Sequence, residues 1–230
     1  MELNLIDIIS LFIAFISILF ALFLLSIKSK NYLSNVLIAI FLFTYAQDSA
    51  AQFVSYFIFP NYPGLYLLIT ITIFLKLPAL YFYILSTIYS DFKLKKKDLW
   101  HMLPFFIVLI IFIPNYFSVD YNAKNAFWEE SNNATRWEIS FNYIFLHIQI
   151  LVYFIASYLA VYKYKHLLLE NYSNANKFNY RWMLRLISIY AIIAVLEGTR
   201  HLFMFMNIDF LSRYALLLFV QMIIILHNQN

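Results

Sequence analysis

The residues of this sequence that are best suited to chemistry are charged side chains within long apolar stretches. Asp48 lies in one such stretch and Lys76 in the next. Glu197, Arg200 and His201 form a third group, and their spacing of i, i+3 and i+4 places them on one face of a helix. Ionisable residues are costly inside a membrane, so each is a candidate functional residue if these stretches span a bilayer.

Asp48 and Lys76 lie at matching depths in their apolar stretches. At 1.5 Å per residue, Asp48 is about 20 Å from the start of its stretch, and Lys76 is about 16 Å from the opposite-facing start of the next. These depths nearly coincide in a hydrocarbon layer of about 30 Å, so adjacent antiparallel helices would pair the two charges. Three interpretations stay open: a structural ion pair that fixes helix register, a pair that contacts a ligand, and a proton or ion relay.

More polar side chains are expected in the outward-facing half of the helices. Gln52 and His147 join the third group there, whereas the opposite halves carry almost no polar groups. A small-molecule pocket needs a largely apolar wall with a few polar anchors. Hydrogen bonding between helices without a ligand is the alternative. The candidate ligand-binding residues are therefore Asp48, Gln52, Lys76, His147, Glu197, Arg200 and His201.

The composition argues against several classes of site. The chain has no cysteine and 2 glycines, which excludes a thiolate metal site, a cysteine nucleophile and a glycine-rich phosphate loop. His147, His201 and Glu197 show no close-spaced zinc motif. The sequence also contains no Gly-x-Ser-x-Gly elbow. We therefore expect no catalytic residue, no metal and no cofactor, and a protein that is not an enzyme.

The composition also predicts the elements that position these residues. Of the 230 residues, 63% are hydrophobic and 12% are charged, compared with roughly 45–50% and about 25% in soluble domains. So few charges cannot cover a soluble globule, and a helix of about 20 apolar residues spans a bilayer. We expect an all-α polytopic membrane bundle that forms one transmembrane domain over residues 1–230. Its seven spans are predicted at residues 6–27, 35–57, 65–89, 99–113, 139–162, 182–206 and 210–226.

The basic residues predict the orientation of the bundle. Ten Lys and Arg residues lie in the loops after the first, third and fifth spans, and three lie on the other side. Because basic loops favour the cytoplasm, we expect the N-terminus outside and the C-terminus in the cytoplasm. The densest run should set the topology and contact anionic lipid headgroups; relay of a signal to a cytoplasmic partner is the alternative. This run comprises Lys93, Lys95, Lys96 and Lys97.

Three stretches resemble a known family. Residues 78–105 (PALYFYILSTIYSDFKLKKKDLWHMLPF) combine a proline, aromatic residues and a lysine run in an order that resembles bacterial membrane-bound AraC-type transcription regulators. Residues 35–46 (NVLIAIFLFTYA) and 172–186 (YSNANKFNYRWMLRL) resemble the same family. The resemblance implies a seven-helix, signal-sensing input domain in the bacterial cytoplasmic (inner) membrane, followed by a cytoplasmic helix-turn-helix domain.

The resemblance also implies the partners. The DNA-binding part would follow residue 230, so we expect contact with DNA only through a domain missing from this chain. The lipid bilayer, a small-molecule or envelope signal and a second copy of the chain in a homodimer are the other expected partners.

A small-molecule transporter or permease-like bundle is the alternative function. Seven spans with an outside N-terminus also suit such a protein, although we find no internal repeat of the kind that transporters carry. Pro78 within the third span should free a backbone carbonyl and kink the helix. A kink beside Lys76 would couple a pocket to the lysine run.

Overall fold

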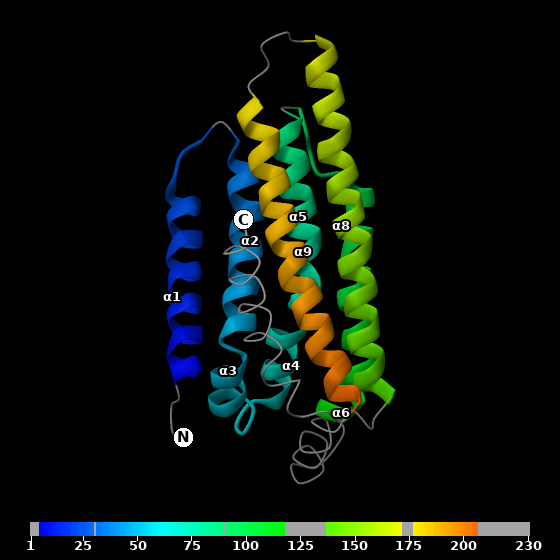
Figure 1. Cartoon of the computed structure of the whole chain (residues 1–230). Coiled ribbons are helices and arrows are strands. Elements are labelled where there is room, and N and C mark those ends of the chain that lie inside the picture. The colour runs from blue at the N-terminus through cyan, green and yellow to red at the C-terminus, as the bar shows by residue number, and fades with distance from the viewer. Residues whose placement is uncertain (1–4, 30, 90, 118–136, 172–176, 207–230) are drawn as a thin grey trace, which may run out of the picture.

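All regular structure in the described part of the chain is helical, which confirms the predicted all-α class. The computed structural model describes residues 5–29, 31–89, 91–117, 137–171 and 177–206. In Figure 1, α1, α2, α5, α8 and α9 run side by side along the molecule, and α3 and α4 lie at one end. In chain order the helices are α1 (Leu5–Ser26), α2 (Tyr32–Ser49), α3 (Ala51–Ile58), α4 (Pro63–Ile71), α5 (Ile73–Ile88), the 3₁₀ helix η1 (Lys96–Met102), α6 (Leu103–Phe117), α8 (Trp137–Asn171) and α9 (Lys177–Phe205).

Four helical segments of the described residues are long and apolar enough to cross a membrane. They correspond to the first, third, fourth and fifth predicted spans. In the positions of the second and sixth spans the chain is also helical, as α2 with α3 and as α9. The predicted span at 210–226 lies outside the described residues. The four segments are Asp7–Ser26, Pro63–Ile88, Lys96–Pro114 and Trp137–Leu167.

The second and third predicted spans are each interrupted by a single residue. Ala50 separates α2 from α3 with φ −90° and ψ 9°. Thr72 separates α4 from α5, and its hydroxyl donates to the carbonyl of Ile69 at 2.6 Å, a local bond of the kind that bends helices. The same hydroxyl lies 3.3 Å from Oε1 of Gln47. The two interruptions therefore lie at a similar level of the bundle.

A tight turn at Phe59–Tyr62 reverses the chain between α3 and α4. Pro63 follows as the first residue of α4, where its missing N–H costs no helical hydrogen bond. Pro60, Pro63 and Gly64 lie in this segment, and residues of these types commonly break helices. We call this end of the bundle the turn end.

Helix α5 lies at the centre of the packing and takes part in two separate apolar clusters. Phe74 belongs to the turn-end cluster, with residues of α3, α4, α6 and α8. Leu80, Ile84 and Ile88 belong to the basic-end cluster, with residues of α8 and α9. Lys76 lies on α5 between these two clusters.

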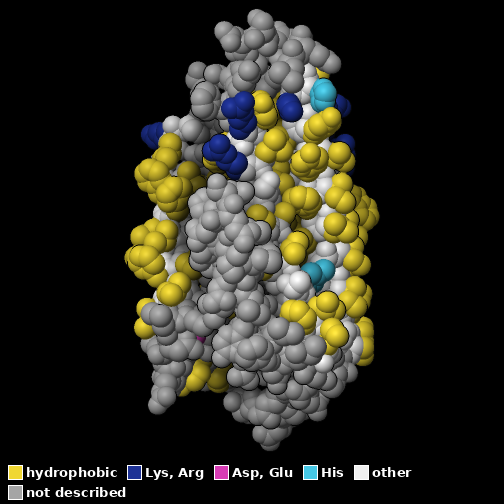
Figure 2. Space-filling view, viewed as in Figure 1, with side chains coloured by type: hydrophobic (Ala, Val, Ile, Leu, Met, Phe, Trp, Pro, Cys, Tyr) yellow, Lys and Arg dark blue, Asp and Glu magenta, His cyan; other side chains and the backbone are white. Residues whose placement is uncertain are grey.

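The opposite end of the bundle carries basic side chains, and we call it the basic end. Figure 2 shows Lys and Arg side chains gathered towards the end at which α1 meets α2. Exposed Lys28 follows α1, exposed Lys163 lies towards the C-terminal end of α8, and exposed Arg181 lies near the start of α9. The loops that the charge pattern assigned to one side therefore share one end of the described bundle.

Candidate ligand site around Asp48 and Lys76

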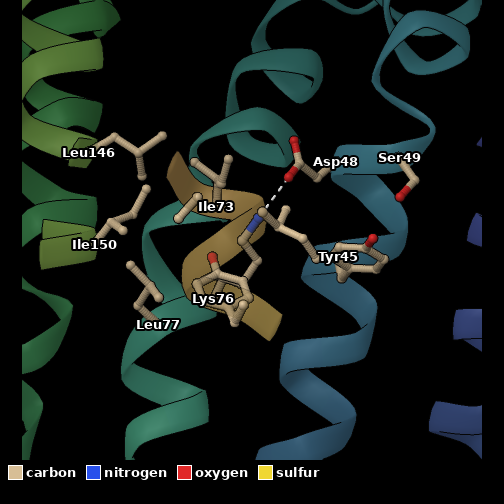
Figure 3. A pocket seen from close by; sticks show the side chains of 11 residues that line it. Tyr45, Asp48, Ser49, Ile73, Lys76, Leu77, Leu146 and Ile150 are labelled. Atoms are coloured by element: carbon tan, nitrogen blue, oxygen red, sulfur yellow. Dashed lines mark hydrogen bonds and ion pairs between the residues drawn. The ribbon is translucent and has the colours of Figure 1, made fainter. Parts of the chain in front are cut away.

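The ion pair predicted between the second and third spans is present. Nζ of Lys76 lies 2.7 Å from Oδ2 of Asp48. The side chains are 9% and 33% exposed, respectively, so the carboxylate keeps partial access to its surroundings while the ammonium is buried. Figure 3 shows Lys76 reaching from α5 towards Asp48 on α2. The matching depths in the sequence therefore predicted the pairing correctly.

Two tyrosine rings lie close to the Lys76 ammonium. Nζ lies 5.8 Å from the ring centroid of Tyr45 and 6.0 Å from that of Tyr190. An ammonium within about 6 Å of an aromatic face is attracted by the negative potential of the ring. The carboxylate and the two rings together stabilise a charge among apolar helices.

A cavity of about 130 Å³ adjoins the ion pair. For comparison, an engineered apolar cavity of about 150 Å³ holds a benzene molecule. The cavity therefore has room for one small ring or for the end of a larger molecule. Figure 3 shows part of its lining. It is lined from α2 by Tyr45, Asp48 and Ser49, from α5 by Ile73, Lys76 and Leu77, from α8 by Leu146 and Ile150, and from α9 by Tyr190, Ile193 and Ala194.

Each of three helices presents a single face to this cavity. The residues contributed by α5 and α9 are spaced i, i+3 and i+4, and those of α8 are spaced i and i+4. Residues with these spacings are neighbours on a helix surface. The wall is therefore mostly apolar, with the charged pair and the two tyrosines as polar anchors, as a small-molecule site requires.

Pro78 creates an unusual contact between α5 and α8 within one helical turn of the ion pair. A proline has no N–H, so the carbonyl of Phe74, four residues earlier, loses its helical partner. Nε2 of Gln149 on α8 donates to this carbonyl at 2.9 Å. Gln149 is 5% exposed, and its Oε1 has no partner among the described residues. The freed carbonyl expected at Pro78 is therefore confirmed, and α8 supplies the missing donor.

His147 lies in a different place from the ion pair. Its Nδ1 is 2.7 Å from the carbonyl of Tyr143, one turn earlier in α8. Its ring lies against Gly198 of α9 and lines an open groove of about 360 Å³ between the two helices. His147 does not line the cavity beside Asp48 and Lys76.

The structure describes only some of the other predicted site residues. Gln52 on α3 and Glu197, Arg200 and His201 on α9 have side chains outside the described part of the chain. Among the described residues, no three His, Asp or Glu side chains are grouped to hold a metal ion. Of the described candidates for the ligand site, the fold brings Asp48 and Lys76 together.

Gly198 allows the close approach of α9 to His147. A Cβ at this position would lie 3.2 Å from Cδ2 and 3.3 Å from Nε2 of His147. Overpacking costs about 1–3 kcal/mol. Replacing a glycine within a helix by a better helix former gains about 1 kcal/mol in helix propensity. We expect Gly198→Leu to lower the free energy of unfolding in detergent micelles by about 1 kcal/mol, which is the middle of the net range. Val195→Leu, at a 63% exposed position of the same helix, is the control and should be neutral. Equal stability of both variants would contradict close packing at Gly198.

Sequence reasoning missed Tyr45, Tyr190 and Gln149. Two of them left a signal: Tyr45 lies three residues before Asp48 and so shares its face of the helix. Pro78 required a donor for the Phe74 carbonyl, and Gln149 is a polar residue in a neighbouring apolar span. We find no local pattern that singles out Tyr190.

Comparison with known proteins gives no relative for this chain. No protein-family model matches the sequence. No curated protein matches it. No solved structure matches the fold.

Proposed function

We propose that this chain is a membrane-embedded sensing domain and that its ligand binds in the cavity beside Asp48 and Lys76. The observation that carries the proposal is a charged pair next to an open cavity inside an apolar bundle. Burying an ion pair commonly brings little net stability, so such a pair is weak evidence for a purely structural role. A polar group of a ligand would find both a donor and an acceptor here.

The chemistry of the cavity restricts the class of ligand. A carboxylate that is one-third exposed, a buried ammonium and two tyrosine rings favour a small molecule with a ring and a polar or zwitterionic group. The volume of about 130 Å³ limits the buried part to about the size of one six-membered ring.

Helix α5 connects this cavity to the basic end. Its N-terminal residues line the cavity, Pro78 interrupts its hydrogen bonding, and the lysine run follows its C-terminal end. A ligand that binds two arrangements of α5 with different affinity would shift the balance between them. This arrangement supports a signal that passes from the cavity towards the lysine run.

The proposal extends to topology and family. We propose a multi-pass protein of the bacterial cytoplasmic membrane with seven spans, the N-terminus outside and the basic end in the cytoplasm. The gathering of basic residues at one end supports this orientation. The resemblance of residues 78–105 to membrane-bound AraC-type regulators supports an output domain that would follow residue 230.

A ligand screen with matched variants tests the sensing proposal. The full chain in detergent micelles is screened against small ring compounds that carry amino, carboxyl or hydroxyl groups, with the thermal unfolding midpoint as the readout. We expect a ligand to raise the midpoint of the wild type and of Lys28→Met, a control at an exposed lysine of the basic end. It should not raise that of Lys76→Met, because the ammonium that it binds is gone. A compound that stabilises Lys76→Met as well as the wild type would place the binding site elsewhere.

Transport is the second candidate function, and one observation favours it. Both spans that carry the ion pair are interrupted beside it, at Ala50 and Thr72. Discontinuous helices at mid-membrane form the substrate sites of many transporters. Uptake into vesicles that contain the full chain separates the two functions. Accumulation of a stabilising compound in wild-type vesicles, with none in Lys76→Met vesicles, would favour transport over sensing.

A further inference from the structure

A second cavity, of about 640 Å³, lies at the basic end and takes no part in the proposed ligand site. It lies between the last turns of α5, the segment that follows α5, and η1. Lys93, Lys95 and Lys97 line it, whereas their neighbour Lys96 does not. We call this cavity the lysine pocket.

The wall of the lysine pocket is built from packed aromatic rings. The ring centroid of Phe82, whose side chain is buried, lies 4.8 Å from that of His101 and 6.1 Å from that of Phe92. Nδ1 of His101 lies 2.5 Å from the hydroxyl of Tyr153 on α8. Contacts from α5, η1 and α8 therefore fix the wall in place.

The charge of the pocket favours an anion. The three lysines are exposed, and no ion pair joins them to an Asp or Glu in the part of the chain that the structure describes. Asp98 also lines the pocket, but its Oδ2 accepts the backbone N–H of Lys95 at 2.7 Å. Asp91 is the second carboxylate of the lining. Three ammonium groups thus face two carboxylates, one of which is engaged by the backbone.

An exposed apolar surface lies directly beside the lysines. In a 3₁₀ helix, residues i and i+3 lie one above the other, so Lys97 and Trp100 share one row of η1. Trp100 is 72% exposed, and Leu99 and Leu103 are 65% and 45% exposed. Tryptophan is enriched at the boundary between lipid and water. The lysines of the pocket and these exposed apolar side chains are therefore neighbours, as the headgroup and the acyl chains of a lipid are.

We propose that the lysine pocket binds the phosphate of one anionic phospholipid. The ammonium groups of Lys93, Lys95 and Lys97 donate charge-assisted hydrogen bonds to the phosphate oxygens. The acyl chains lie along Leu99, Trp100 and Leu103. A soluble phosphate monoester would satisfy the same lysines, but it would leave this apolar surface uncovered.

Lipid titrations of the full chain test this assignment. The protein in detergent micelles is mixed with short-chain phosphatidylglycerol, short-chain phosphatidylcholine or glycerol phosphate, and the bound molecules are counted by native mass spectrometry. We expect one phosphatidylglycerol to bind more tightly than either alternative. Lys97→Gln should weaken its binding about five-fold, the factor that corresponds to about 1 kcal/mol per basic residue at an anionic surface. Lys97→Arg should retain binding, because it keeps the charge.

Lys96→Gln is the matched control, since Lys96 is equally exposed and adjacent but lies outside the pocket. It should change the affinity by less than about two-fold. Equal losses for Lys96→Gln and Lys97→Gln would overturn the proposal, because they would indicate a diffuse attraction to the lysine run. Equal binding of phosphatidylcholine would also overturn it.

A last variant separates a lipid from a soluble phosphate. Trp100→Ala should weaken the binding of phosphatidylglycerol and leave that of glycerol phosphate unchanged. If glycerol phosphate binds as tightly as the lipid and Trp100→Ala has no effect, the pocket binds a soluble phosphate and the lipid assignment is wrong. Neither result bears on the cavity at Asp48 and Lys76, so the two proposals fail independently.

Discussion

Replacing Asp48 with leucine is expected to lower the free energy of unfolding by about 3 kcal/mol, the low end of the range for breaking a buried ion pair. The loss arises because the Lys76 ammonium, whose side chain is 9% exposed, remains among apolar helices without its carboxylate. Lys76→Met should cost less. It leaves the Asp48 carboxylate, which is 33% exposed and retains part of its access to water.

The double variant Asp48→Leu/Lys76→Met should lie within about 1 kcal/mol of the wild type, because removing both charges also removes the cost of burying them. Reversible unfolding in mixed micelles, without added ligand, gives the three free energies. If the free energy of unfolding falls in the double variant by as much as in the two single variants added together, the two charges do not stabilise each other.

The second large effect is expected at Gln149. Its replacement by leucine leaves the Phe74 carbonyl buried without a donor, which costs about 2 kcal/mol. Pro78→Ala restores the backbone N–H that this carbonyl lacks. In the Pro78→Ala background, Gln149→Leu should therefore cost about 1 kcal/mol or less.

The four free energies of this cycle give the coupling between Gln149 and Pro78 directly. Ile148→Leu, at the neighbouring 54% exposed position of α8, controls for a general effect of changes in this helix. If Gln149→Leu lowers the free energy of unfolding equally in both backgrounds, the Gln149 amide does not replace the hydrogen bond that Pro78 removes.

The features that sequence reasoning captured are those that follow from position along a helix. Asp48 and Lys76 pair because the depth of a residue in a span depends only on the rise per residue and on where the span begins. The lysine run follows α5, and its side chains are exposed; its predicted place in the cytoplasm stays a prediction.

The features that it missed depend on how helices rotate against one another. Neither Ala50 nor Thr72 is a helix-breaking residue, so the local sequence does not predict that the helices are interrupted at these two residues. The bend at Thr72 involves its own hydroxyl and a contact with Gln47 on another helix. Tyr190 faces Lys76 because of the rotation of α9 relative to α5, which packing decides. The lysine pocket likewise depends on η1 folding back against Phe82.

Pro78 lies on α5 between Phe74, which belongs to one apolar cluster, and Leu80, which belongs to the other, so a bend of the helix at Pro78 would move its C-terminal half relative to the cavity. The segment from Pro78 to Ile88 is about 15 Å long. A tilt of about 10° at Pro78 would move Ile88 by roughly 2.6 Å, which is close to the length of a hydrogen bond. Spin labels at Thr87 and Lys28, both exposed at the basic end, would report this movement as a change in one distance.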